Sequence, residues 1–288
     1  MQLSKTQLAG ALATASLLVP AAAFAATING GPASEHLRGT SAADTINGNG
    51  GNDRIHGLAG NDKLNGGPGN DRIFGDAGND AIAGVQGNDW LNGGAGNDTI
   101  VGDANDAGDR TSLDRIFGGA GNDTLKGGDS ADRIYGGSGN DTVSGENGND
   151  TLAGGTGDDV EDGGAGNDRI FGNRGVDVLH GGDGNDVLWA VARADVTPSS
   201  TGAVDTVGDT LDGGNGDDVL HARDGEVDKI TCGPGNDTAL LDTVDVITDA
   251  TTANPNGSCE TVKRAAPKPR DSRAEDAQES PAAARISA

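Results

Sequence analysis

The sequence predicts an all-β solenoid built from a nine-residue repeat. Three observations predict it: an Asp recurs every nine residues, an aliphatic residue follows most of these Asp residues by two positions, and glycines fill the segment between. Residues 66–74 show the unit as Gly-Gly-Pro-Gly-Asn-Asp-Arg-Ile-Phe. A period this short, present about twenty times, is typical of solenoids.

The two halves of the unit have different physical properties. The glycine half can turn sharply, because glycine tolerates positive φ. The other half is a minimal strand, in which one apolar residue points inward between two outward residues. Glu161 and Ala239 break the rule by standing at the apolar position.

The repeated Asp residues indicate a cation. Carboxylates gathered in regular rows repel one another, so a compact chain needs positive charge between them. The alternative is that the Asp residues only make turns, as Asp and Asn do well. Turns alone do not require Asp at one position in every copy, so we favour the cation.

On these motifs the chain resembles the repeats-in-toxin family of secreted calcium-binding proteins, over residues 39–240. The resemblance implies a parallel β-roll in which two short strands, from two repeats or 18 residues, make one coil. It also implies multiple Ca²⁺ ions in the turns, held by backbone carbonyls and by Asp carboxylates of stacked coils. Stacked partners would be Asp53 with Asp71, Asp62 with Asp80, and Asp132 with Asp150.

The predicted calcium ligands are the Asp residues of well-formed repeats. They are Asp53, Asp62, Asp71, Asp80, Asp89, Asp98, Asp123, Asp141, Asp150, Asp159, Asp168, Asp177, Asp186, Asp218 and Asp237. Asp44, Asp114, Asp132 and Asp209 follow residues that depart from the Gly-Asn pattern. We expect poorer or absent calcium binding at these four.

Composition predicts that folding depends on the metal. The formal net charge is −25, and only 2% of residues are aromatic, so the core is thin and the chain repels itself. Without metal we expect a disordered or loosely collapsed chain, and folding and binding then become one event. Oxygen ligands without a thiol or imidazole cluster favour Ca²⁺ over transition metals.

The N-terminus predicts export. Lys5 precedes an apolar stretch from Leu8 to Val19, and residues 23–25, Ala-Phe-Ala, form a small-residue cleavage pattern. We interpret residues 1–25 as a signal peptide cut before Ala26, which makes the protein secreted and extracellular. The alternative is an uncleaved anchor, but the apolar stretch is short for a membrane span. No other segment is apolar enough to span a membrane.

The remaining chain divides into a roll at 26–240, with loop insertions near 102–113 and 190–208, a cap at 241–264 and a disordered tail at 265–288. Cys232 and Cys259 are the two cysteines. In an exported protein we expect one disulfide between them, which would link the cap to the end of the roll. A reactive thiol is the rival interpretation, and no basic or His neighbour in the sequence supports it.

Alternate repeats differ in their outward residues, so the two faces of the roll should differ. One face would carry a stripe of Arg and aromatic residues: Arg54, Arg72, Phe74, Trp90, Arg115, Phe117, Arg133, Tyr135, Arg169, Phe171 and Trp189. Exposed aromatic and Arg residues are typical of contact surfaces, here for an anionic polysaccharide or a protein. Alternatively, Arg offsets nearby Asp charge and the rings cover a thin strand. The strongly negative chain is a poor ligand for nucleic acid.

Catalysis has no support in the sequence. No nucleophile elbow, zinc motif or phosphate loop occurs, and the four His residues are scattered. We therefore expect a structural or adhesive calcium-binding protein and not an enzyme. A glycan- or protein-binding module is the alternative, and a toxin component is less favoured. Ice binding would require a regular Thr row in the turns, which is absent.

Overall fold

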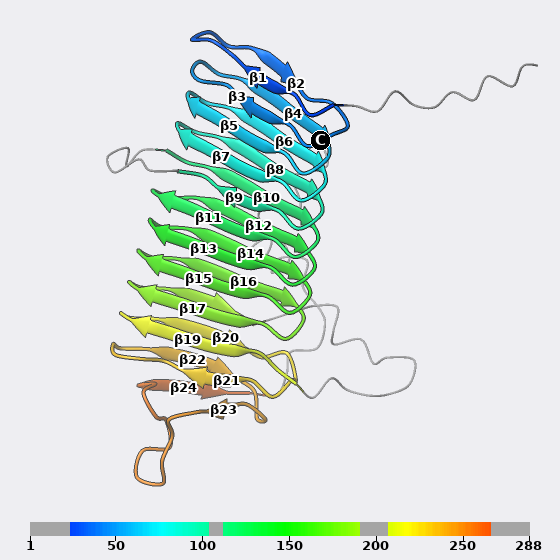
Figure 1. Cartoon of the computed structure of the whole chain (residues 1–288). Helices are drawn as coiled ribbons and strands as arrows, with labels where there is room; N and C mark the ends of the chain where they lie inside the picture. Colours follow the sequence, from blue (N-terminus) through cyan, green and yellow to red (C-terminus); the bar gives the residue numbers. More distant parts are fainter. Residues whose placement is uncertain (1–23, 104–111, 191–206, 266–288) are drawn as a thin grey trace, which may run out of the picture.

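The chain forms an elongated solenoid of two parallel β-sheets, shown from the side in Figure 1. The computed structural model describes residues 24–103, 112–190 and 207–265. Each sheet holds twelve strands; the odd-numbered strands form one sheet and the even-numbered strands the other. This arrangement confirms the all-β solenoid and the placement of alternate repeats in opposite sheets.

The odd sheet contains β1 (Thr27–Asn29), β3 (Thr45–Asn47), β5 (Lys63–Pro68), β7 (Ala81–Gln86), β9 (Thr99–Val101), β11 (Thr124–Asp129), β13 (Thr142–Asn147), β15 (Val160–Ala165), β17 (Val178–Asp183), β19 (Thr210–Asn215), β21 (Lys229–Thr231) and β23 (Val246–Ile247). The even sheet contains β2 (His36–Arg38), β4 (Arg54–Ala59), β6 (Arg72–Ala77), β8 (Trp90–Ala95), β10 (Arg115–Ala120), β12 (Arg133–Ser138), β14 (Thr151–Thr156), β16 (Arg169–Arg174), β18 (Val187–Trp189), β20 (Val219–Ala222), β22 (Thr238–Leu241) and β24 (Thr261–Arg264).

Strand register follows the repeat through both interruptions. Ile55 on β4 pairs with Ile73 on β6, one coil further along the chain. Across the first interruption Trp90 pairs with Arg115, and across the second Val178 pairs with Thr210. The extra residues are therefore accommodated without a change of face. The predicted loops lie largely at 104–111 and 191–206, outside the described residues.

The core is a file of single aliphatic side chains between the two sheets. Ile73, Leu91 and Leu125 are each fully buried, as are most residues at the predicted apolar position. Glu161 and Ala239, which break the pattern, also stand in this file and are fully buried.

Many strands are longer than the three residues that the sequence predicts. β6, for example, runs for six residues from Arg72 to Ala77 and includes Gly75 of the glycine half. The glycines allow this because neighbouring coils approach closely. A Cβ on Gly137, whose φ is 122°, would collide with the carbonyl oxygen of Gly119.

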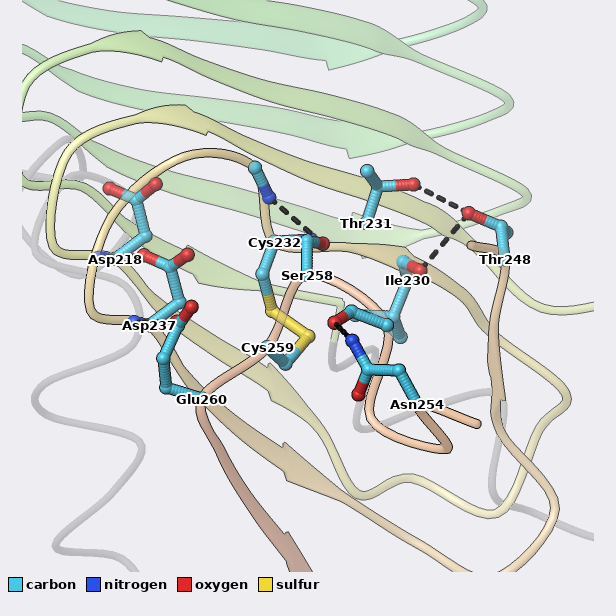
Figure 2. The surroundings of a disulfide bond; sticks show 12 residues. Asp218, Ile230, Thr231, Cys232, Asp237, Thr248, Asn254, Ser258, Cys259 and Glu260 are labelled. Atoms are coloured by element: carbon cyan, nitrogen blue, oxygen red, sulfur yellow. Dashed lines mark hydrogen bonds between the residues drawn. A yellow bond between two sulfur atoms is a disulfide. The ribbon is translucent and has the colours of Figure 1, made fainter. Parts of the chain in front are cut away.

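The C-terminal segment continues the roll. β23 pairs with β21 and β24 pairs with β22, so the sheets show no break at the predicted boundary near residue 240. The predicted disulfide is present between Cys232 and Cys259, drawn in Figure 2. The hydroxyl of Ser258 accepts hydrogen bonds from the amides of Cys232 and Gly233.

The two predicted terminal segments fall mostly outside the described residues. These are the signal peptide, of which only residues 24 and 25 are described, and the tail, of which only residue 265 is described. Within the part of the chain that the structure describes, no helix is long and apolar enough to cross a membrane.

Candidate metal centres

The repeated Asp residues form two rows, one along each edge where the chain enters a strand. The odd row precedes odd-numbered strands and contains Asp44, Asp62, Asp80, Asp98, Asp123, Asp141, Asp159, Asp177, Asp209, Asp228 and Asp245. The even row precedes even-numbered strands and contains Asp53, Asp71, Asp89, Asp114, Asp132, Asp150, Asp168, Asp186, Asp218 and Asp237. Every one of these side chains is buried. A buried carboxylate is costly unless it is paired or coordinates a metal.

Each carboxylate is fixed by the coil before it. Oδ1 of Asp71 accepts a hydrogen bond from the amide of Asp53 at 2.7 Å, and Oδ1 of Asp150 accepts one from Asp132 at 2.7 Å. The stacked pairs predicted from the sequence are therefore confirmed. A carboxylate that accepts a backbone N–H is held in one orientation.

The second oxygen of most row residues has no hydrogen-bond donor. Among the described residues, Oδ2 is buried without a hydrogen-bond partner in Asp53, Asp62, Asp71, Asp80, Asp89, Asp98, Asp123, Asp132, Asp141, Asp150, Asp159, Asp168, Asp186, Asp218, Asp228 and Asp237. A buried ionised oxygen of this kind requires a compensating charge. Repeated along both edges, this arrangement indicates cation-binding sites.

The first glycine of each repeat leaves a space that a cation fits. A Cβ built on Gly75 would collide with Oδ2 of Asp80 and would also meet the carbonyl oxygen of Gly93 from the next coil. The carboxylate and the carbonyl thus converge where glycine has no side chain. Carboxylate and carbonyl oxygens are the ligands that Ca²⁺ prefers, so the residues present fit the ion that the resemblance implies.

Without a cation the rows hold protons tightly. Burial raises the pKa of Asp71 to about 6, of Asp98 to about 7 and of Asp89 to about 8. Neighbouring carboxylates contribute, such as Asp53 next to Asp71. Burial and like charges both disfavour the ionised form of these carboxylates. In the metal-free chain at neutral pH, ionisation of the rows therefore destabilises the folded form.

The four repeats expected to bind poorly do not behave alike. Oδ1 of Asp114 accepts the amide of Asp89 at 2.8 Å, and Oδ1 of Asp132 accepts the amide of Asp114 at 2.8 Å. Both carboxylates are therefore held in the same way as those of regular repeats. At Asp44, both Oδ2 and Oδ1 accept hydrogen bonds from Thr40, so fewer oxygen lone pairs remain for an ion. The corner of Asp209 has a different construction, described below.

Acidic residues that the sequence reasoning missed extend both rows. Glu35 precedes β2 and donates its amide to Oδ1 of Asp53 at 2.8 Å. Asp245 accepts the amide of Asp228 at 3.3 Å, and Glu260 accepts that of Asp237 at 2.8 Å. Figure 2 shows Glu260 below Asp237 and Asp218 in one column. Glu35 could have been found, because it stands 18 residues before Asp53.

The Arg and aromatic stripe lies entirely on the even sheet, as predicted. We call the eleven residues the even face: Arg54, Arg72, Phe74, Trp90, Arg115, Phe117, Arg133, Tyr135, Arg169, Phe171 and Trp189. Arg54 stands opposite Arg72 and Arg115 opposite Arg133 in the register. Among the described residues, no carboxylate lies within 4.0 Å of these guanidinium groups as an ion pair.

The rings of the even face stack along the axis of the roll. Phe171 stacks on Trp189 with centroids 4.5 Å apart, and Trp90 lies 5.4 Å from Phe117. Phe117 is 9% exposed and Phe171 only 3%, so the expectation that all the aromatics are exposed is wrong for these two. Parallel strands are about 5 Å apart, so a ring on one strand covers the ring on the next.

Comparison with known families matches the RTX calcium-binding nonapeptide repeat at residues 29–64, 47–82, 56–89, 74–106, 113–143, 127–161, 162–191 and 207–239. These matches together cover more than half of the chain and include every member of both rows except Asp245. A search of the curated proteins finds no match.

Replacing Asp141 with Asn tests one candidate calcium ligand of the odd row. Asn keeps an oxygen that can accept the amide of Asp123 but replaces the charged Oδ2. Affinity for Ca²⁺ depends on the number of charged ligands, so we expect the calcium concentration at the folding midpoint to rise by roughly twofold or more. Circular dichroism during a calcium titration measures it. The control is Asp158→Asn, an exposed position whose oxygen accepts the amide of Val176. Equal midpoints for both variants would contradict the assignment.

The metal-free chain should respond to pH. Burial raises the pKa of Asp71 to about 6 and of Asp89 to about 8 in the roll, against 3.8 for an unshifted Asp. The folded form binds more protons in this range, so its stability is greatest at low pH and is lost as pH rises through 6 to 8. In chelator we expect more β signal near pH 5 than near pH 8. A coil spectrum unchanged between the two would show that the rows do not control folding.

Proposed function

Because the chain belongs to the RTX calcium-binding nonapeptide repeat family, we propose that it is an exported protein that folds on binding Ca²⁺ outside the cytoplasm and serves as a structural or adhesive rod. The observation that carries the proposal is the pair of buried carboxylate rows with unbonded Oδ2 atoms. Calcium bound along the rows would offset their repulsion, so that binding and folding are one event.

Export is supported by two further features. The N-terminal sequence has the charge, apolar stretch and small-residue pattern of a signal peptide. The disulfide between Cys232 and Cys259 is typical of an oxidising compartment. A chain that stays unfolded where calcium is scarce suits passage across a membrane before folding.

A structural role agrees better with the described surface than catalysis does. His56 and His180 each lie beside a carboxylate, Asp76 at 3.1 Å and Asp212 at 3.4 Å, on the surface of the roll. Among the described residues, neither pair has a hydrogen bond to a Ser or Cys side chain. The repeat fold itself is typically structural.

Calcium-driven folding is tested by far-ultraviolet circular dichroism of residues 26–288 after chelation, near pH 8. We expect a coil spectrum that changes cooperatively to a β spectrum as Ca²⁺ is added, because the ion supplies the charge that the rows lack. Mg²⁺ demands a smaller octahedral site and should not reproduce the change. A β spectrum present in chelator and indifferent to calcium would refute the proposal.

A second function, binding of an acidic polymer by the even face, is favoured by the unpaired arginines. Like charges directly opposite on neighbouring strands are destabilising, and the Arg54–Arg72 and Arg115–Arg133 pairs are such contacts, although the Arg54 guanidinium also lies 5.4 Å from the centroid of the Phe74 ring. An anionic ligand would offset this repulsion. A groove of about 750 Å³ lies where the even row meets this face, and Arg54, Arg72, Trp90 and Arg115 line it together with the row carboxylates Asp53, Asp71 and Asp89.

This second function is tested on an immobilised uronic-acid polymer at fixed calcium. Replacing Arg115, Arg133 and Arg169 with Ser should abolish retention and leave calcium-dependent folding intact. The matched control replaces Lys63, Lys126 and Lys229 with Ser, which removes the same charge from the odd sheet. Retention that is absent in the wild-type chain, or equal in the two variants, would refute it.

A further inference from the structure

The odd row changes its construction at the C-terminal end of the roll. Its earlier turns begin with a glycine, and a Cβ at that position would collide with the carboxylate, as Gly136 shows with Asp141. The last three turns of this row begin instead with Ala190, Ala222 and Leu241, whose side chains are buried. The glycine space of the repeat is therefore filled at these corners.

A buried carboxylate outside the two rows appears at the same place. Asp224 lies inside the turn from Ala222 to Asp228 and is buried, whereas acidic residues inside regular turns, such as Asp76 and Asp183, are not. Asp209, Asp224 and Asp228 each present one oxygen, and the three atoms lie within 4.8 Å of one another. All three residues are buried, with exposures of 2%, 7% and 0%.

One oxygen in this cluster has no hydrogen bond. Oδ1 of Asp228 accepts the amide of Asp209 at 2.7 Å, whereas its Oδ2 is buried without a hydrogen-bond partner among the described residues. Oδ1 of Asp224 accepts the amide of Glu226 at 2.9 Å, which fixes that side chain within the turn. The cluster is thus oriented by the backbone and leaves charge unsatisfied.

No basic side chain neutralises the cluster within the part of the chain that the structure describes. The ion pairs found there involve other residues. Arg223, next to Asp224 in sequence, donates to the carbonyl oxygens of Leu241 and Lys263, and Arg264 donates to those of Asp242 and Asp245. Three buried carboxylates this close together repel strongly unless a cation lies between them.

We propose that Asp209, Asp224 and Asp228 hold a Ca²⁺ ion at a site distinct from the glycine cradle of the repeats. The inference rests on the proposed calcium-dependent folding and adds a ligand, Asp224, that the repeat lacks. An all-carboxylate set selects a hard cation. Asp228 directly precedes β21 and Cys232 directly follows it, so the ion and the disulfide hold the last coils at the two ends of one strand.

The test counts bound ions in the full mature chain by native mass spectrometry at saturating calcium. Asp224→Asn keeps an oxygen that can accept the amide of Glu226, and Asp224→Ser is measured in parallel in case one replacement disturbs the turn. We expect one ion fewer than in the wild-type chain and faster hydrogen exchange in β21 and β23. The control is Asp217→Asn, which removes an exposed carboxylate and keeps the acceptor for the amide of Asn236.

The outcomes separate this inference from the proposed function. A wild-type chain that binds no calcium refutes both. A wild-type chain that binds calcium, with the same ion count in whichever Asp224 variant folds, overturns only the site at Asp224. Loss of one ion from the Asp224 variants and none from Asp217→Asn supports the site.

Discussion

The structure depends on the way each Asp divides its two oxygens. One oxygen accepts the amide of the Asp one coil earlier, as Asp71 does for Asp53, and so sets the rise and register of the solenoid. In most row residues the other oxygen is buried without a hydrogen-bond partner among the described residues. The same residue therefore specifies the fold and places the charge that the proposed Ca²⁺ would offset.

The hydrogen-bonded Asp turns hold the coils in register, so that equivalent residues of successive coils line up along the roll. Because coils stack in register, residues at one position of the repeat form a file: aliphatics inside, and on the even face in-register Arg pairs and stacked rings. The pairing of Trp90 with Arg115 shows that an insertion adds length to one coil without moving later residues to the other face. An extended one-sided surface is thus a consequence of the repeat and not of local packing.

The sequence predicts most of the architecture because the nine-residue repeat determines it. Asp, aliphatic and glycine positions are sufficient for the sheets, the core and the stacked carboxylates. What it does not predict arises where neighbouring coils interact: β6 extends into the glycine half, and Phe171 is covered by Trp189. Asp245 and Glu260 were missed for a different reason. Their separations from the preceding row members, 17 and 23 residues, depart from the period.

The ends of the rows show how a repeat that depends on its neighbours can terminate. An end coil lacks the next carboxylate that would accept its amides, and end units of solenoids are therefore atypical. At the N-terminal end, Glu35 accepts the amide of Gly31 in its own turn at 3.1 Å. At the other end Glu260 accepts the amide of Asp237. Both ends of the even row thus use Glu, whose longer side chain reaches an amide when the turn departs from the regular geometry. The odd row instead loses its glycines and gains Asp224, so the end of each row is built by a local change of chemistry and not by a further repeat.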